Sequence, residues 1–552
     1  MTLKHFALTG FIAVTTFSQI AQADTGHREL RKKYQKSFVA DSVALKAPNN
    51  WFNLDFANDK VLGVSTEKAY QHLQNRTSRT VVVAIIDSGV DVKHEDLQGI
   101  IWVNPKEVAG NGVDDDKNGY VDDVNGWSFL GNKNGQNVKD DTYEVTRQYA
   151  RLRKEFENKK KIKRKQKEEY AQYQKIKADY EKEVKEAQAQ AADFQKFYDT
   201  FKQAESIVQK HLGVTDFTPS QVEAINSTDM RVMKSKALLQ YAYENNLVAE
   251  IKNAAEHFDY VLKFGLNPDF DPRSIVGDNY EDINDKFYGN NDVIGPDADH
   301  GTHVAGIVAA NRRNNLGVKG VADNVKIMVV RAVPNGDERD KDVANAIYYA
   351  VNNGAQVINM SFGKSYTSNK EAVDAAMKYA ESKGVLLVHG AGNDGENLDQ
   401  ATNYPSRTLK NGQTLQNWLE IGATAWENNE KFVANFSNYG KQSVDVFAPG
   451  VDIYSLGPNQ IYQEHSGTSM ASPVTAGVAA LLFSYFPELT AVQVRDIILK
   501  SSLKYSNLEV VKPGLDKKVE TGLVPFGSLS ITGGIVNAYE AVKMAEQLSA
   551  QK

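Results

Sequence analysis

Short apolar runs alternate with helix-like patterns in two parts of the chain, from Trp51 to about residue 135 and from about residue 292 to Met544. Four runs of β-branched or other apolar residues predict buried strands, at 80–86, 327–330, 357–360 and 385–388. The segments 342–353 and 370–383 have helical spacing and end at glycines. Alternating strands and helices predict an α/β fold with a parallel sheet covered by helices on both faces.

The middle of the chain, residues 138–290, has a different pattern and predicts a large helical insertion. Apolar residues recur there every three or four positions along 173–201, which predicts one stripe on a long helix. Two interpretations of this stripe stay open, a helical hairpin that packs within the protein and a coiled coil that binds a partner. The basic run 159–165 has acidic neighbours, and we interpret it as a solvated helix face rather than a nucleic-acid site.

The first 23 residues have the three parts of a secretory signal peptide. A basic start precedes an apolar stretch from Phe6 to Ile20, and Ala21-Gln22-Ala23 provides small residues for cleavage before Asp24. Residues 24–50 then form an N-terminal extension. No later segment offers about twenty consecutive apolar residues, so we expect an exported protein without a membrane anchor, in the periplasm or the extracellular medium.

Composition narrows the possible chemistry further. The chain has 552 residues, a formal charge of −6 and no cysteine. A slightly acidic chain gives no general attraction to nucleic acid, and we expect no nucleic-acid partner. The absence of cysteine excludes disulfides, thiolate nucleophiles and cysteine-bound metals. Any covalent catalysis must use other side chains.

Three motifs at predicted ends of strands or helices contain the residues needed for nucleophilic catalysis. Asp87 follows the strand 80–86, His303 lies in the segment Asp299-His300-Gly301-Thr302-His303, and Ser469 lies in Gly467-Thr468-Ser469-Met470-Ala471-Ser472-Pro473 before an apolar helix. An imidazole can accept a proton from a hydroxyl when a carboxylate holds its other nitrogen. A serine at a helix N-terminus lies where the helix dipole favours negative charge.

These motifs, in this order, resemble those of the subtilisin-like serine peptidases, peptidase family S8. The resemblance covers a first part at 51–137 and a second part at 291–548, which the insertion 138–290 separates. It implies a subtilisin-like fold and an endopeptidase that hydrolyses peptide bonds through an acyl-enzyme. In that scheme Ser469 is the nucleophile, His303 is the base and Asp87 orients the base.

The resemblance also implies the residues that bind the substrate. Asn393, in the loop Gly390-Ala391-Gly392-Asn393, would donate its side-chain amide to the oxyanion, together with the backbone N–H of Ser469. The segment Ser361-Phe362-Gly363 would pair with an extended peptide, and Gly390, Ala391 and Gly392 would form the facing wall of a specificity pocket. Backbone pairing of this kind predicts broad specificity for protein and peptide substrates.

An acidic loop at 114–123 predicts a calcium site. We expect no organic cofactor. Oxygen-bearing residues stand at alternating positions, and a glycine at position six allows a turn. The expected ligands are the side chains of Asp114, Asp116, Asn118 and Asp122 and the backbone carbonyl of Tyr120. Asn125 stands where a complete EF-hand would have glutamate, so a solvated turn remains the alternative.

Two other functions stay open on the sequence alone. One is a catalytically silent subtilisin-like scaffold, whose cleft the insertion blocks. The other is an adhesion or assembly protein that uses the helical insertion to bind a partner. The insertion separates the predicted acid from the predicted base, and we therefore hypothesise that it lies at the rim of the cleft and restricts which substrates enter.

Overall fold

The computed structural model describes residues 47–245, 247–515 and 522–550. The predicted signal peptide, residues 1–23, and residues 24–46 of the predicted extension lie outside the described residues. The chain divides into two compact units: a helical unit, Val145–Phe270, and a sheet unit that comprises Lys46–Glu144 and Asp271–Lys552. The helical unit is shorter at both ends than the predicted insertion, because the flanking segments 138–144 and 271–290 belong to the sheet unit.

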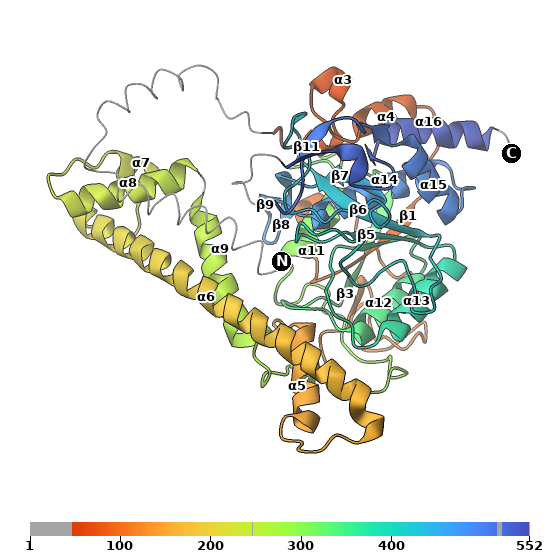
Figure 1. The fold of residues 1–552 in the computed structure, drawn as a ribbon. Helices are drawn as coiled ribbons and strands as arrows, with labels where there is room; N and C mark the ends of the chain where they lie inside the picture. The colour runs from red at the N-terminus through yellow and green to blue at the C-terminus, as the bar shows by residue number, and fades with distance from the viewer. Residues whose placement is uncertain (1–46, 246, 516–521, 551–552) are drawn as a thin grey trace. The chain divides into compact units, whose positions relative to one another are not determined.

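The sheet unit is built on one nine-stranded sheet with the order β10-β13-β7-β6-β5-β4-β1-β3-β2 (Figure 1). All pairs in this sheet are parallel except the pair of β10 with β13. The strands are β1 Val81–Asp87, β2 Gly126–Ser128, β3 Val325–Arg331, β4 Val357–Met360, β5 Leu386–Gly390, β6 Trp418–Thr424, β7 Val446–Pro449, β10 Leu503–Lys504 and β13 Gly534–Ile535. The predicted strands are therefore confirmed as neighbours in one sheet.

Helices cover both faces of the sheet, because alternate residues of each buried strand point to opposite sides. In β1, Val83 and Ile85 pack in one core cluster, and Ala84 and Ile86 pack in another. The first cluster includes helices α4 Thr66–His72, α11 Asp299–Ala309, α14 Thr468–Tyr485, α15 Ala491–Ser501 and α16 Ala538–Ser549. The second includes α12 Asp340–Asn352 and α13 Lys370–Ser382. This arrangement confirms the predicted α/β fold.

Helix α14 is the central buried helix of the first cluster. All of its residues except Ser469 are buried. It packs closely on the segment before β3, since a Cβ at Gly477 would lie 2.6 Å from Cβ of Val321. A helix that is apolar all round is stable only inside a protein. Burial of α14 therefore holds its N-terminal residue pair, Thr468 and Ser469, in a defined place.

Strands β5, β4 and β1 are neighbours, and their carboxyl ends meet at one edge of the sheet. Ile86 of β1 pairs with Met360 of β4, and Met360 pairs with His389 of β5. The residues that follow these positions are Asp87, Ser361 and Gly390. Binding sites in parallel sheets form outside such ends.

The helical unit has a hydrophobic core of its own. Helix α6, Lys167–Leu212, packs on α8, Met230–Glu244, and α9, Leu247–Tyr260, and Phe194, Phe201 and Val208 of α6 are buried between them. The shorter helices are α5 Glu144–Phe156 and α7 Pro219–Glu223. The apolar stripe predicted for this region is therefore used for packing within the unit.

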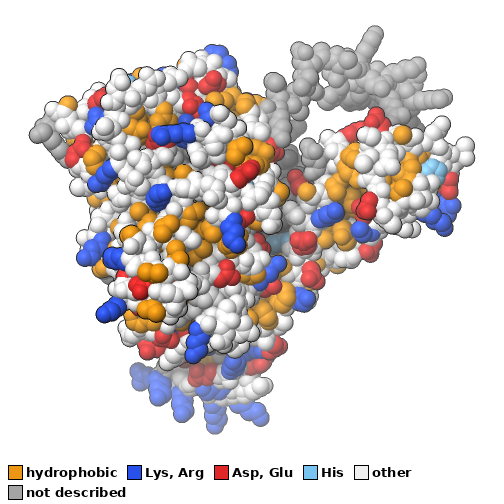
Figure 2. Space-filling view, turned by 180° about the vertical axis from the view of Figure 1, so that it is seen from behind, with side chains coloured by type: hydrophobic (Ala, Val, Ile, Leu, Met, Phe, Trp, Pro, Cys, Tyr) orange, Lys and Arg blue, Asp and Glu red, His pale blue; other side chains and the backbone are white. Residues whose placement is uncertain are grey.

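The basic run lies in the connection between α5 and α6 rather than on a helix face. Lys160, Lys161, Lys163, Arg164 and Lys165 are exposed, and Arg164–Gln166 forms a single 3-10 turn. Figure 2 shows Lys and Arg side chains gathered at the lower end of the view, where this connection lies in Figure 1. In the described part of the chain, no helix is both long enough and apolar enough to cross a membrane.

We expect the Phe201→Ala substitution to destabilise the helical unit by about 3–5 kcal/mol, because it leaves a cavity in this core. Phe201 is 1% exposed. Chemical denaturation followed by circular dichroism would measure the change. The control is Met230→Ala, because Met230 is 63% exposed and its truncation should change stability by less than about 0.5 kcal/mol. Equal effects of the two substitutions would contradict the described core.

Candidate active site

Asp87 and His300 form the central polar pair at the edge where β5, β4 and β1 end. Asp87 is the last residue of β1, and its side chain is 3% exposed. Its Oδ1 lies 2.8 Å from Nδ1 of His300 and accepts a 2.7 Å hydrogen bond from the backbone N–H of Ser88. His300 is the second residue of α11, and about a third of its side chain (36%) is exposed.

Two glycines allow α11 to come this close to β1. A Cβ at Gly301 would lie 2.1 Å from the carbonyl oxygen of Gly89 and 3.2 Å from Cβ of Asp87. Gly89 itself has φ +132°, which disfavours any other residue. The Gly-containing segments around Asp87 and His300 therefore serve the close approach of the two motifs.

The carboxylate of Asp87 controls the protonation of His300. Burial by itself disfavours the imidazolium, but the charge of Asp87 and its hydrogen bond outweigh burial and raise the pKa of His300 above its ordinary value of 6.5. In the neutral ring, Nδ1 carries the proton that Asp87 accepts. Nε2 is then the proton acceptor of His300.

The prediction that His303 pairs with Asp87 is wrong, because His300 occupies that position. His303 lies one helical turn further along α11 and is fully buried. Its Nε2 lies 3.0 Å from the carbonyl oxygen of Ile453 and 3.2 Å from that of Gln463. These residues belong to the hairpin of β8, Ile453–Gly457, and β9, Ile461–His465.

His303 is a neutral histidine of the core. Two carbonyl acceptors at Nε2 require that this nitrogen carries the proton. Its ring stacks on His465 with centroids 4.3 Å apart. Burial, together with the charges that His465 and His300 can carry, holds the pKa of His303 well below its ordinary value. His303 thus joins α11 to the hairpin.

Ser469 lies at the second position of α14 and contacts the carboxyl end of β4. Its hydroxyl donates to the carbonyl oxygen of Ser361 at 3.2 Å, and the hydroxyl of Ser361 donates to the carbonyl oxygen of Ser469 at 2.8 Å. In this conformation the Ser469 hydroxyl is bonded to Ser361. Because Ser361 and Asp87 follow paired residues of neighbouring strands, Ser469 and the pair Asp87–His300 lie at the same edge of the sheet.

The side-chain amide of Asn393 and the backbone N–H of Ser469 are two hydrogen-bond donors that both lie close to Gly467. The Oδ1 of Asn393 accepts from the backbone N–H of Thr468 at 2.8 Å and from its hydroxyl at 3.0 Å. These bonds define which end of the amide faces Thr468. A Cβ at Gly467 would lie 3.6 Å from both Asn393 Nδ2 and the Ser469 nitrogen. Two such donors can stabilise a developing oxyanion.

The two predicted substrate segments, Ser361–Gly363 and Gly390–Gly392, extend from the neighbouring strands β4 and β5. The side chain of Asn403, a residue that no sequence motif indicates, lies between them. Its Nδ2 donates to the carbonyl oxygen of Ala391 at 3.0 Å, and a Cβ at Gly363 would lie 2.5 Å from its Oδ1. Phe362 is partly exposed, while Ala391 is buried. No pattern near Asn403 could have pointed to this place, because the contact depends on folding.

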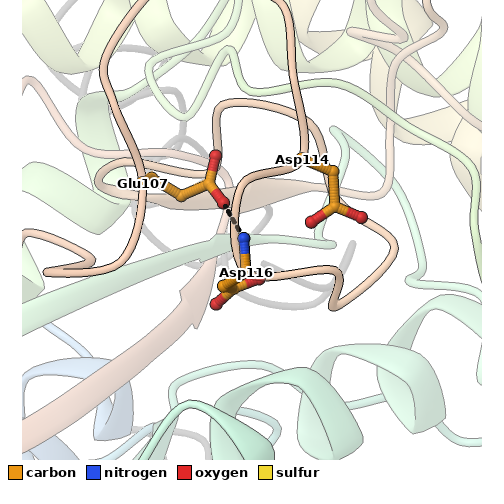
Figure 3. Close-up of side chains that lie close together, drawn as sticks. All are labelled: Glu107, Asp114 and Asp116. Carbon is orange, nitrogen blue, oxygen red and sulfur yellow. Dashed lines mark hydrogen bonds between the residues drawn. The ribbon is translucent and has the colours of Figure 1, made fainter.

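Carboxylates gather in the predicted metal loop. One oxygen each from Glu107, Asp114 and Asp116 lies within 4.8 Å of the others (Figure 3). The backbone N–H of Asp116 donates to Oε1 of Glu107 at 3.1 Å. Oε2 of Glu107 is buried and has no hydrogen-bond partner. Hard oxygen ligands in this arrangement fit a cation such as Ca²⁺.

The predicted ligand set changes in two ways. Glu107 joins Asp114 and Asp116, although it precedes the motif. Asp122 lies outside this group of three, and its oxygens accept from the backbone N–H groups of Gly110, Asn111 and Gly112 at 2.7–3.1 Å.

Asn118 bonds within the loop itself, whereas the ligand role of the Tyr120 backbone carbonyl stays a prediction. Oδ1 of Asn118 accepts from the N–H of Tyr120 at 2.8 Å, and Nδ2 of Asn118 donates to Asp123 at 3.0 Å. Burial raises the pKa of Asp123 to about 6, although hydrogen bonds from Tyr349, Asn118 and Asn104 lower it in part. The side chain of Tyr120 is buried.

Comparison with known proteins identifies relatives of this chain. The sequence profile of the Subtilase family, Peptidase_S8, matches residues 78–523. The chain is 42% identical to the thermophilic serine proteinase of Bacillus sp. strain AK1 over 219 residues. This match covers 40% of this chain and 49% of that protein. The chain thus matches about half the length of this relative.

Two further relatives are matched over a larger share of their own length. The chain is 41% identical to subtilisin DY of Bacillus licheniformis over 201 residues, which is 36% of this chain and 68% of that protein. It is 39% identical to thermitase of Thermoactinomyces vulgaris over 216 residues, which is 38% of this chain and 72% of that protein.

The different surroundings of the two histidines predict different titrations. In NMR of ¹⁵N-histidine-labelled protein, His300 should protonate with a pKa above 6.5, and His303 should remain neutral at pH values well below 6.5. The Asp87→Asn substitution should lower the pKa of His300 and leave that of His303 low. If His303 titrated above His300, the described pairing would be refuted.

Proposed function

Because the chain belongs to the Subtilase family, we propose that it is a serine endopeptidase with a triad of Asp87, His300 and Ser469. The observation that carries this proposal is the 2.8 Å contact between Asp87 and His300 at the edge where Ser469 lies. It replaces His303 by His300 in the role of general base. The other predicted roles are retained.

Each step of peptide hydrolysis then has a group to perform it. The Ser469 hydroxyl turns from Ser361 to His300 Nε2, which takes its proton as Ser469 Oγ attacks the scissile carbonyl. Such hydrogen bonds are often long or poorly aligned in the free enzyme and tighten when substrate binds. Asp87 keeps the Nδ1 proton in place and stabilises the imidazolium. His300 then protonates the leaving amine, and water hydrolyses the acyl-enzyme.

The oxyanion forms beside Asn393 and the N-terminus of α14. Asn393 Nδ2 and the backbone N–H of Ser469 donate to it, and Thr468 fixes the amide orientation through the bonds described above. An extended substrate pairs its backbone with Ser361–Gly363, opposite Gly390–Gly392. Contacts of this type recognise backbone more than side chains, which supports broad cleavage of protein and peptide substrates.

We also propose that the protein is exported to the periplasm or the extracellular medium. This proposal rests on the pattern of residues 1–23, which predicts a signal peptide. N-terminal sequencing of the protein recovered outside the cytoplasm should begin at Asp24 or further along the chain.

The proposed triad predicts that substitution of His300 abolishes peptidase activity and that substitution of His303 does not. Ser469→Ala and His300→Ala should each lower kcat by a factor on the order of 10⁶, which is the known loss when the serine or histidine of subtilisin is removed. His303→Gln should retain readily measurable cleavage of casein at temperatures where it stays folded. If folded His303→Gln were as inactive as His300→Ala, the assignment would fail.

We further propose that Ca²⁺ binds at Glu107, Asp114 and Asp116 and stabilises the loop. Three carboxylates near one another repel unless a cation or protons balance their charge. The buried, unbonded Oε2 of Glu107 supports a ligand at this place. The role of such an ion is structural.

Calcium should therefore raise the midpoint of thermal unfolding. Binding at a free concentration of about 100 times Kd stabilises a folded protein by about 2.7 kcal/mol. Calorimetry with Ca²⁺ and with a chelator should show this shift in the native sequence, a reduced shift in Glu107→Gln, and the full shift in the control Asp193→Asn. Asp193 is a half-exposed carboxylate of the helical unit. An equal shift in all three proteins would place the ion elsewhere.

A further inference from the structure

A buried lysine directly follows the proposed substrate segment Ser361–Gly363. The side chain of Lys364 is only 1% exposed. Its ammonium group donates to the carbonyl oxygen of Glu338 at 2.6 Å and contacts carboxylate oxygens of Asp340 at 2.8 Å and Glu144 at 3.4 Å. A buried charge is tolerated only when it is paired in this way, and it holds its partners in a defined geometry.

Asp340 is itself held firmly in this cluster. Its Oδ2 accepts from the Thr367 hydroxyl at 2.8 Å and from the backbone N–H groups of Ser368 at 2.8 Å and Asn369 at 2.6 Å. Burial opposes ionisation of Asp340, but Lys364 and these hydrogen bonds prevail and hold its pKa well below its ordinary value. Asp340 therefore favours its ionised form beside Lys364.

The chain that leads into the helical unit forms hydrogen bonds and ion pairs with the residues just before Asp340. Asp141 donates its N–H to the carbonyl oxygen of Asn335 at 2.7 Å, and its carboxylate pairs with Arg339 at 2.7 Å. Glu144, the residue before the helical unit, donates its N–H to Asp337 at 2.8 Å. Its buried carboxylate is the one that contacts Lys364.

The chain that leaves the helical unit also forms ion pairs with residues next to Asp340 in this region. Asp271, the first residue after the unit, pairs with Arg339 at 2.9 Å. Arg273 then pairs with Asp342 at 2.6 Å and with Asp278 at 2.7 Å. Both flanking segments thus hold the residues 335–342, and Lys364 joins those residues to the substrate segment.

The substrate segment is in turn bonded to Ser469. Two hydrogen bonds join Ser361 and Ser469, as described above. On its other side, Lys364 exchanges two backbone hydrogen bonds with Tyr404, at 3.0 and 2.8 Å. Lys364 is therefore the position where a side-chain contact from the chain that leads into the helical unit meets the backbone of the substrate segment.

We propose that Lys364 is a positioning residue that holds Ser361–Gly363 in place for extended substrates, and that Glu144 ties this function to the chain leading into the helical unit. The proposal rests on the proposed peptidase function. Loss of Lys364 should weaken binding of substrates that pair with the segment. It should affect much less those substrates that only acylate Ser469.

The test compares Lys364→Met on two substrates, a tetrapeptide anilide that extends along the segment and an acetylated amino-acid nitrophenyl ester that does not. We expect kcat/KM for the anilide to fall about tenfold or more, mainly through KM, because hydrogen bonds to a charged group are lost. The ester should change less than about twofold. Glu144→Gln should show the same selective loss to a smaller degree.

Lys370→Met is the matched control. Lys370 lies in the same region and pairs with Asp374 at 2.6 Å. It comes seven residues after the segment in the sequence, and its ammonium group also donates to the carbonyl oxygen of Thr408. Its substitution should leave the ratio of the two activities unchanged. Equal losses on both substrates in folded Lys364→Met, or no loss on either, would overturn the inference.

Two further outcomes are informative. If Lys364→Met does not fold, the nearly isosteric Glu144→Gln decides, and an unchanged ratio in that variant overturns the inference. Ser469→Ala separates this inference from the proposed function. Retained hydrolysis in Ser469→Ala refutes the peptidase itself, whereas its loss without a selective effect of Lys364 or Glu144 refutes only the positioning role.

Discussion

The parallel register of β5, β4 and β1 is the constraint on which the candidate site depends. It brings Gly390, Ser361 and Asp87 to one edge, although they are far apart in the sequence. Each strand end therefore supplies a different group: the loop of Asn393, the proposed substrate segment and the carboxylate. Helices α11 and α14 begin at the same edge and add His300 and Ser469. Packing of these apolar elements determines the distances between the polar groups.

Burial gives the two histidines of one helix opposite properties. The nearly buried carboxylate of Asp87 requires compensation, which Ser88 and His300 supply, and this raises the pKa of His300. One turn later, His303 faces only backbone carbonyls and another ring, so the neutral form is favoured. The first histidine is therefore protonated more readily than an ordinary imidazole, and the second contributes to packing.

The helical unit interrupts the sequence of the sheet unit, but the strands of the sheet keep their parallel register. Its core is formed by its own helices, and the flanking chain is held by buried ion pairs such as Asp141–Arg339 and Arg273–Asp342. Pairs of this kind contribute little net stability, but breaking one leaves an uncompensated charge. They thus specify where the insertion begins and ends, and Lys364 extends this network to the substrate segment.

The sequence alone determined the α/β class, four strands of the sheet, the helical insertion and the motifs around Asp87 and Ser469, because these follow from local periodicity and from residue order. It also indicated Asp114 and Asp116. It led to His303 as the base, which is wrong, because His300 and His303 flank the same Gly-Thr pair and the choice between them depends on how closely Gly301 lets α11 approach Gly89. Glu107, Asn403 and Lys364 likewise acquired their places only in the tertiary structure, because distances across a folded chain are set by packing and not by spacing along it.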